Sequence, residues 1–162
     1  MTASPDALIS CAGLSKIYEG GVAALTGLTL DIRPGQTAGL LGENGAGKST
    51  LLRLIMGFQF PTDGEIRVFG EREVRRAHPR IGYVPERQFA EPQLSGERYL
   101  RYLAELSGLW GAVARQRVAA VLAQVDLSDA GSRRIGTYSK GMLQRLGIAG
   151  ALLHDPLAAM CS

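Results

Sequence analysis

Hydrophobic and polar positions follow two different periods along the chain. Up to about residue 84, apolar residues form short runs or alternate with polar ones, and turn residues separate the runs. This pattern is typical of β-strands. It predicts strands at residues 8–14, 24–32, 37–41, 65–69 and 81–84. The run at 37–41 leads directly into Gly42, so we expect a buried strand that feeds a glycine-rich loop.

The segment directly after this loop carries apolar residues on nearly every side, and helical periodicity dominates the chain from residue 95 onward. Helices are expected at residues 48–56, 95–107 and 112–125, and from about residue 140 onward. Ser95 can cap the second of these helices, and Gly57 can end the first in the left-handed conformation. Strands around a glycine loop, followed by a helical segment, predict an α/β fold.

The composition is that of a folded globular protein. The chain has 162 residues, which is long enough for one domain with a core. Of these residues, 46% are hydrophobic and 20% are charged, as in ordinary globular proteins. The formal net charge is only +3. The densest basic group is Arg72, Arg75, Arg76 and Arg80. A nucleic-acid surface usually shows a stronger basic stripe, so we favour a solvated charged face and expect no nucleic-acid partner.

The cysteines and the hydropathy bear on the compartment. Cys11 and Cys161 lie near opposite ends without metal-ligand spacing, which fits a reducing compartment and no disulfide framework. No segment approaches the ~18 uninterrupted apolar residues that a membrane helix requires. We therefore expect a cytoplasmic protein for which any role at a membrane comes through a partner.

Residues 42–52 read GENGAGKSTLL and carry the main candidate chemistry. A glycine, four residues and then Gly-Lys-Ser is the spacing of a phosphate-binding loop. The glycines let backbone N–H groups converge on phosphate oxygens, and the following helix adds its positive N-terminal end. Lys48 would reach the terminal phosphates, and the Ser49 hydroxyl would ligate Mg²⁺. A chance match is the alternative, which the predicted strand before the loop and the helix after it disfavour.

The loop alone does not choose among nucleotide-binding families. GTPases usually add an Asn-Lys-x-Asp element, which this sequence lacks, whereas small-molecule kinases stay open as an alternative. Three further stretches occur in fixed order with the loop: Tyr18, IGYVPE at 81–86, and YSKGMLQRLGIAGALLHDP at 138–156. Together the four resemble the ATP-binding subunits of ABC transporters, over nearly the whole chain from Leu8 to Pro156. The resemblance implies a P-loop NTPase fold with an N-terminal antiparallel β part and an α-helical subdomain.

The resemblance also implies that ATP and Mg²⁺ bind at the loop. The nucleotide-binding residues that it implies are Tyr18, Gly42, Asn44, Gly45, Gly47, Lys48, Ser49 and Thr50. Tyr18 would stack on the adenine, and a tyrosine that only packs at a strand end is the alternative. Glu86 stands where most of the family has a glutamine that touches magnesium and the attacking water, so the implied metal ligands are Ser49 and Glu86. An exposed loop carboxylate without a role is the alternative for Glu86.

The stretch at 138–142 resembles the signature motif of the family. Ser139 and Gly141 match the serine and the second glycine of the motif. Lys140 replaces the first glycine, and Met142 replaces the glutamine. In the family this motif contacts the γ-phosphate held by the opposite subunit, and the parts of an anion site are kept here: a hydroxyl, a glycine backbone and a helix N-terminus. A serine that only caps a core helix is the local alternative.

The resemblance implies three parts and two kinds of partner. The parts are the β part and P-loop core at 1–86, the α-helical subdomain at 87–136, and the signature motif with its helix at 137–162. The partners are transmembrane subunits and a second ATP-binding subunit, which would hold the protein at the cytoplasmic face of a membrane. The Tyr-Ser-Lys-Gly-Met and Tyr-Val-Pro-Glu forms look most like ATPases paired with exporter-type membrane subunits.

After Pro156 the family continues with an apolar strand that ends in Asp-Glu, a second aspartate loop and a histidine. This sequence has residues 157–162 there. We therefore expect a chain truncated before that Walker B strand, with an incomplete core sheet, an unpaired strand at 37–41 and an incomplete catalytic set. Three functions stay open: the ATPase subunit of an exporter, a non-catalytic fragment that binds nucleotide weakly at most, and a soluble relative that acts on nucleic acid or the ribosome.

Overall fold

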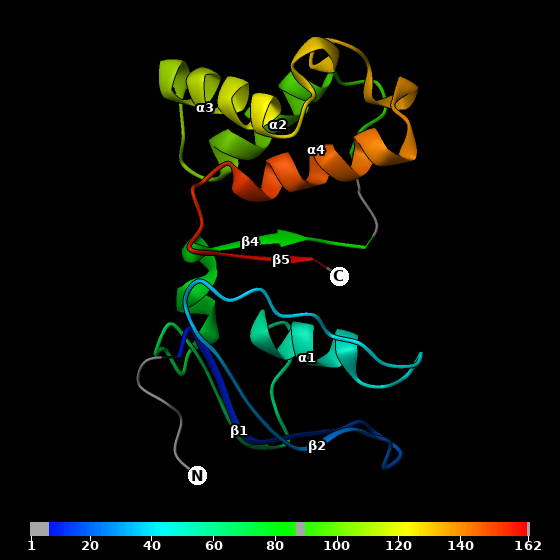
Figure 1. Cartoon of the computed structure of the whole chain (residues 1–162), viewed down its shortest axis with the longest axis vertical. Helices are drawn as coiled ribbons and strands as arrows, with labels where there is room; N and C mark the ends of the chain where they lie inside the picture. Colours follow the sequence, from blue (N-terminus) through cyan, green and yellow to red (C-terminus); the bar gives the residue numbers. More distant parts are fainter. Residues whose placement is uncertain (1–6, 87–89, 162) are drawn as a thin grey trace. The chain divides into compact units, whose positions relative to one another are not determined.

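The computed structural model describes residues 7–86 and 90–161. The chain forms two compact units, Met1–His78 and Pro79–Ser162. Figure 1 colours the described chain from blue at its first residues to red at its last. The first unit holds an antiparallel sheet and the glycine loop, and the second holds three long helices and a parallel strand pair. The three-part division expected at residues 86 and 136 stays a prediction.

An antiparallel sheet forms the body of the first unit. Its central strand β1 (Ile9–Ile17) pairs with β2 (Ala23–Ile32) on one side and with β3 (Asp63–Val68) on the other. Leu14 of β1 and Val68 of β3 are fully buried. The N-terminal antiparallel β part expected from the sequence is therefore confirmed.

One helix of this unit, α1 (Lys48–Ile55), follows the glycine loop. Its residues Leu51 and Leu54 are buried, so the helix packs its apolar side into the core of the unit. Gly57 adopts a φ of 63° just after the helix, which is the left-handed conformation expected from the sequence. The helix predicted at 48–56 is confirmed to within one residue.

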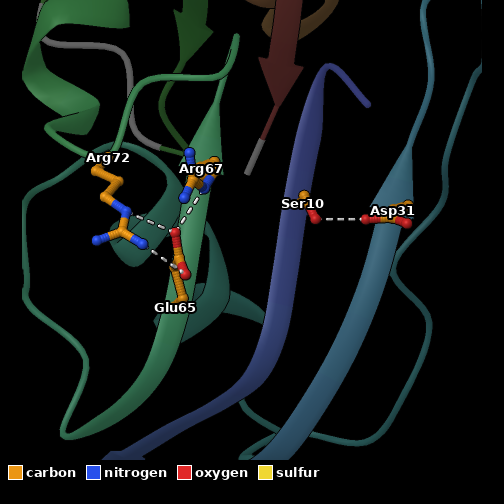
Figure 2. Close-up of polar contacts among 5 residues, drawn as sticks. All are labelled: Ser10, Asp31, Glu65, Arg67 and Arg72. Carbon is orange, nitrogen blue, oxygen red and sulfur yellow. Dashed lines mark hydrogen bonds and ion pairs between the residues drawn. The ribbon is translucent and has the colours of Figure 1, made fainter. Parts of the chain in front are cut away.

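Polar side chains connect the strands of this sheet and the segment after it (Figure 2). The Ser10 hydroxyl on β1 donates to Oδ1 of Asp31 on β2 at 2.5 Å. On β3, Oε1 of Glu65 lies 2.5 Å from Nε of Arg67 and 2.9 Å from Nε of Arg72. Arg72 belongs to the densest basic group of the sequence, so part of that group neutralises a carboxylate of the same chain.

The segment before the glycine loop is not the buried strand that the sequence predicted. Residues 36–43 have no regular secondary structure, and Leu41 is 96% exposed. A strand needs a neighbour for its backbone N–H and C=O groups, and no strand among the described residues pairs with 37–41. The expected buried strand is therefore wrong for this structure, whereas the expected incomplete core sheet agrees with it.

The three long helices of the second unit are α2 (Gly96–Leu106), α3 (Gly111–Gln124) and α4 (Lys140–Leu152). All three were predicted from helical periodicity, and together they supply most of one hydrophobic core. Short 3-10 helices lie at Val74–Arg80 (η1), Ser128–Ala130 (η2) and Ile135–Thr137 (η3). None of the helices within residues 7–86 and 90–161 has the length and apolar character to span a membrane.

A parallel strand pair completes the second unit. β4 (Ile81–Val84) lies beside β5 (Ala158–Cys161) along its whole length. Gly82 of β4 approaches α4 so closely that a Cβ there would meet the carbonyl oxygen of Ala151. The sequence predicted that the strand after Pro156 would be missing, and this expectation is wrong, because β5 forms there. β5 carries no acidic residue.

The packing of α2 predicts which of its leucines supports the fold. Leu100 is 0% exposed, whereas Leu106 at the end of the same helix is 68% exposed. Leu100→Ala should lower the free energy of unfolding by about 2–5 kcal/mol, because it removes buried methyl groups and leaves a cavity. Leu106→Ala is the matched control and should change that free energy by at most about 0.5 kcal/mol. Urea unfolding followed by circular dichroism measures both, and equal losses would contradict this packing.

The two cysteines should differ in reactivity. Burial, together with the charge of Asp31, raises the pKa of Cys11 to about 11, whereas Cys161 is exposed. Only the thiolate reacts, so DTNB at pH 8 should modify Cys161 rapidly and Cys11 only after unfolding.

The pH dependence follows from the same shift. The pKa of Cys11 lies above the ordinary thiol value of about 8.5. The protonated thiol therefore contributes its full stabilisation of the fold below about pH 8.5. This contribution is lost as the pH rises through the folded-state pKa of Cys11. Cys161→Ser is the control and should remove the rapid phase of the DTNB reaction. Two equally rapid thiols in the folded chain would contradict the burial of Cys11.

Candidate nucleotide-binding site

Two glycines give the loop before α1 its shape. Gly45 and Gly47 have φ angles of 89° and 83°, in the left-handed region that side chains disfavour. Gly47 also lacks room for a side chain, because a Cβ there would meet the carbonyl oxygen of Ala24. The N–H of Ala46 donates to the carbonyl oxygen of Glu43 at 3.2 Å and closes a turn. The backbone thus bends tightly and can turn its N–H groups toward an anion.

The N-terminus of α1 is open to such an anion. Gly47 caps the helix without a side-chain hydrogen bond, and the first turn holds no acidic residue. By contrast, Ser95 caps α2 and Ser139 caps α4 through their hydroxyl oxygens. The first N–H groups of a helix have no intrahelical acceptor. Those of α1 can therefore bind phosphate oxygens, together with the positive end of the helix dipole.

Lys48 reaches back over the loop. Its Nζ donates to the carbonyl oxygen of Gly42 at 2.7 Å and to that of Glu43 at 2.6 Å. These acceptors are neutral, whereas phosphate oxygens carry charge and accept from an ammonium more strongly. Asn44, the next residue of the loop, is exposed. Lys48 thus holds its charge inside the loop, where phosphate oxygens can replace the carbonyl oxygens as acceptors.

Ser49 lies in the first turn of α1 and is exposed. Its hydroxyl is an oxygen ligand of the kind that Mg²⁺ takes, and Mg²⁺ usually completes its shell with water and substrate phosphates. No group of three or more His, Cys, Asp or Glu side chains that could hold a metal occurs in the described part of the chain. The loop therefore fits a magnesium ion that binds together with a nucleotide.

Tyr18 lies beside the start of α1. Its hydroxyl is 3.2 Å from Oγ1 of Thr50 and donates to Oε1 of Gln59 at 2.8 Å. The hydrogen bond with Thr50 lowers the pKa of the Tyr18 hydroxyl, because the Thr50 hydroxyl can donate to the phenolate. Thr50 is buried, and its hydroxyl faces Tyr18. The structure thus brings Tyr18 to the end of the glycine loop, while its stacking on adenine stays a prediction.

Gln59 is a residue that the sequence analysis missed. It lies in the segment that follows α1, and its backbone N–H donates to the carbonyl oxygen of Arg53 at 3.3 Å. A single glutamine between two phenylalanines carries no periodicity or motif. No signal in the sequence could have singled it out, because its contact with Tyr18 joins residues 41 positions apart.

Glu86 lies in the second unit, in the bend directly after β4, and is exposed. Its position at the end of this strand agrees with the predicted element. Its role as a magnesium ligand stays a prediction, as does the alternative of a loop carboxylate without a role.

The residues of the signature stretch begin α4. The Ser139 hydroxyl accepts from the N–H of Met142 at 3.2 Å, so the capping role considered from the sequence is present. The hydroxyl keeps its own proton for a further acceptor, because a serine can donate and accept at once. Lys140 and Gly141 are exposed, and the space around Gly141 is open. The cap and an additional contact with an anion are therefore compatible.

Comparison with known proteins identifies the family. The sequence profile described as ABC transporter matches residues 25–160. The chain belongs to the ABC transporter family of ATP-binding proteins. A relative from Nostoc sp., described as an uncharacterised ABC transporter ATP-binding protein, is 38% identical over 96% of this chain and 49% of its own length.

Other relatives have more specific descriptions. A Nod factor export ATP-binding protein from Paraburkholderia xenovorans is 36% identical over 94% of this chain and 51% of its own length. A methionine import ATP-binding protein from Corynebacterium diphtheriae is 34% identical over 89% of this chain and 45% of its own length. The chain spans about half the length of the curated relatives that it matches.

Solved structures confirm the fold class. CbiO1 from Clostridium perfringens, part of the ABC transporter complex cbiONQ, superposes with a TM-score of 0.86 at 25% identity, over 96% of this chain and 65% of that one. An ATP-binding cassette in a dimeric post-hydrolysis state with ADP and Pi gives a TM-score of 0.82 at 24% identity, over 94% of this chain and 72% of that one. The chain therefore has the P-loop NTPase fold of ABC ATPase domains.

The geometry of Gly47 predicts a loop that cannot accept alanine there. Gly47→Ala should lower the free energy of unfolding by about 1–2 kcal/mol, because alanine disfavours the left-handed conformation. The new Cβ should also push the loop away from the carbonyl oxygen of Ala24 and thereby abolish the binding of tripolyphosphate. Gly39→Ala is the matched control, because Gly39 lies outside the left-handed region with no atom within 4 Å of a Cβ. Urea unfolding and calorimetric titration measure both properties. Equal behaviour of the two variants would refute the proposed constraint.

Proposed function

We propose that this chain is the nucleotide-binding part of an ABC transporter subunit that couples ATP binding and hydrolysis to export across a membrane. The observation that carries the proposal is the loop of Gly45 and Gly47 around the Lys48 ammonium, at the uncapped start of α1. Family membership supports ATP as the nucleotide.

The residues of the loop have separate tasks in this proposal. Gly45 and Gly47 turn the backbone so that its N–H groups face the phosphates. Lys48 exchanges its two carbonyl acceptors for phosphate oxygens, which strengthens its hydrogen bonds because the new acceptors are charged. Ser49 offers its hydroxyl to magnesium. When bound, Mg²⁺ neutralises phosphate charge during phosphoryl transfer.

Export is supported by the signature and strand forms and by part of the relatives. Relatives described as a Nod factor export protein and a daunorubicin resistance protein are each 36% identical to this chain. A methionine import protein is similar as well, at 34% identity. Because the relatives include both exporters and an importer, the sequences Tyr-Ser-Lys-Gly-Met and Tyr-Val-Pro-Glu, which resemble those of exporter-type ATPases, are the features that favour export.

Two partners belong to the proposal. A second ATP-binding subunit would place its Ser139 and Gly141 against the phosphates held by Lys48 and Ser49 of the first, which the free proton of Ser139 and the open space at Gly141 support. Such a dimer would lie on the cytoplasmic face of a membrane, held there by transmembrane subunits.

Exposed apolar side chains support the contact with transmembrane subunits. Tyr102 and Leu106 are one turn apart on the same face of α2 and are 56% and 68% exposed. Trp110 and Val113, at the start of α3, are also exposed. Exposed large apolar side chains in neighbouring segments of the chain are candidates for a protein contact.

A second candidate function is nucleotide binding without hydrolysis. β5 carries no carboxylate, and the described residues hold no cluster of metal-binding side chains. Hydrolysis of ATP depends on a group that positions the attacking water and on a metal site. In this case the chain would bind ATP but show no magnesium-dependent turnover.

The charge of Lys48 is expected to decide ATP affinity. Lys48→Ala should weaken ATP binding by at least about tenfold, since a charge-assisted hydrogen bond contributes about 1.5–3 kcal/mol. Arg101→Ala is the matched control, because it removes one exposed positive charge from α2 in the other unit and should leave affinity unchanged. Isothermal titration calorimetry with ATP and Mg²⁺ gives both dissociation constants. A wild-type chain that binds no ATP would refute the proposed function.

A phosphate-release assay on the same proteins separates the two candidate functions. Magnesium-dependent turnover that disappears in Lys48→Ala supports the ATPase subunit and excludes the non-catalytic binder. Binding of ATP without turnover supports the non-catalytic binder.

A further inference from the structure

Tyr18 is fixed by contacts of its hydroxyl and of one face of its ring. The hydroxyl lies 3.2 Å from Oγ1 of Thr50 and 2.8 Å from Oε1 of Gln59. On the ring face, Nζ of Lys16 lies 5.5 Å from the centroid, within the range of a cation–π contact. The ring therefore has little freedom to rotate away from the start of α1.

The hydrogen bonds of the Tyr18 hydroxyl have a defined direction. The side-chain oxygen of Gln59 can only accept, so Tyr18 must donate its single proton to Gln59. Tyr18 then accepts the proton of the Thr50 hydroxyl. The result is a directed chain from Thr50 through Tyr18 to Gln59, in which each hydroxyl proton has an acceptor.

The segment that carries Gln59 is itself attached to β1. Nζ of Lys16 donates to the carbonyl oxygen of Phe60 at 2.9 Å, and the N–H of Ile17 donates to Oγ1 of Thr62 at 3.0 Å. Tyr18 follows these two residues directly in the chain. The segment that carries Gln59 is therefore held in place by hydrogen bonds to β1, and this fixes the position of the Gln59 side chain as the acceptor for the Tyr18 hydroxyl.

Thr50 closes the chain at the glycine loop. It is the third residue of α1 and the last residue of the Gly-Lys-Ser-Thr stretch, and it is only 8% exposed. A hydrogen bond between Thr50 and Tyr18 places the edge of an aromatic ring directly beside the phosphate-binding loop. Aromatic rings in such positions bind nucleobases through stacking, which tolerates any base because every base has a π-face.

We propose that Gln59 is a positioning residue for base binding: the chain of hydrogen bonds from Thr50 through Tyr18 to Gln59 holds the Tyr18 ring, on which the family resemblance implies that the adenine stacks, as a preformed platform. This inference rests on the proposed nucleotide site. A ring that is already fixed loses less freedom when a base stacks on it, which corresponds to an affinity gain of about two- to tenfold. Gln59 itself contacts neither base nor phosphate in this proposal.

The test compares ATP with inorganic tripolyphosphate, which has the phosphates but no base. Gln59→Leu removes the acceptor and should weaken ATP binding about two- to tenfold while leaving tripolyphosphate binding unchanged. Gln59→Glu keeps an oxygen acceptor at the same place and should retain most of the ATP affinity. Gln116→Leu, at an exposed glutamine of α3, is the matched control and should change neither dissociation constant. Calorimetric titration measures each affinity.

A double-mutant cycle links Gln59 to the Tyr18 hydroxyl. Tyr18→Phe keeps the ring and removes the hydroxyl, so it should weaken ATP binding about as much as Gln59→Leu. The double variant should be no weaker than either single variant, because both changes break the same hydrogen bond. Additive losses would show that the two residues act separately and would overturn the proposal.

The remaining outcomes are also decisive. Equal losses for ATP and tripolyphosphate in Gln59→Leu would mean that Gln59 supports the loop as a whole, which overturns the platform. Unchanged ATP affinity in both Gln59→Leu and Tyr18→Phe would do the same, although the nucleotide site would stand. A wild-type chain that binds neither ligand would refute the site and the platform together. Circular dichroism establishes whether each variant is folded. If Gln59→Leu does not fold, Tyr18→Phe provides the test instead.

Discussion

The close approach of Gly47 to the carbonyl oxygen of Ala24 is the contact on which the phosphate-binding loop depends. Ala24 belongs to β2, and β2 is held by its pairing with β1. The start of α1 is thus placed against a strand end through a backbone contact with no room for a side chain. The left-handed φ of Gly47 then turns the chain into the helix without a side-chain cap, which leaves the first N–H groups of α1 available to an anion.

The same strand pair also positions the other parts of the nucleotide site. β1 ends at Ile17, and Tyr18 directly after it contacts Thr50 in the first turn of α1 and Gln59 beyond the end of that helix. The helix is therefore connected to the sheet near its start and beyond its end. Between these two contacts, the Leu51 side chain is buried. Ordering these elements together means that a bound nucleotide needs little further rearrangement within this unit.

In the second unit, side chains cap both ends of α4. Ser139 caps α4 and remains able to donate a hydrogen bond, because capping uses only its oxygen as an acceptor. At the other end of α4, the Arg117 guanidinium donates to the carbonyl oxygens of Leu152 and Leu153 at 2.7 and 2.8 Å. Both ends of the helix are thus satisfied, and the residues at its N-terminus stay exposed.

The long helices, the serine caps of α2 and α4 and the spacing of the phosphate-binding loop were predictable from local sequence, because they depend on residues at most about five positions apart. The strand expected at 37–41 did not form, since a strand needs hydrogen-bonding neighbours that local periodicity cannot supply. β5 was missed because residues 157–162 lack the Asp-Glu ending of the family's strand, although a strand needs only a paired backbone and β4 supplies it. Gln59 entered the site only through tertiary structure, which brings it to Tyr18 across 41 positions that no local pattern connects.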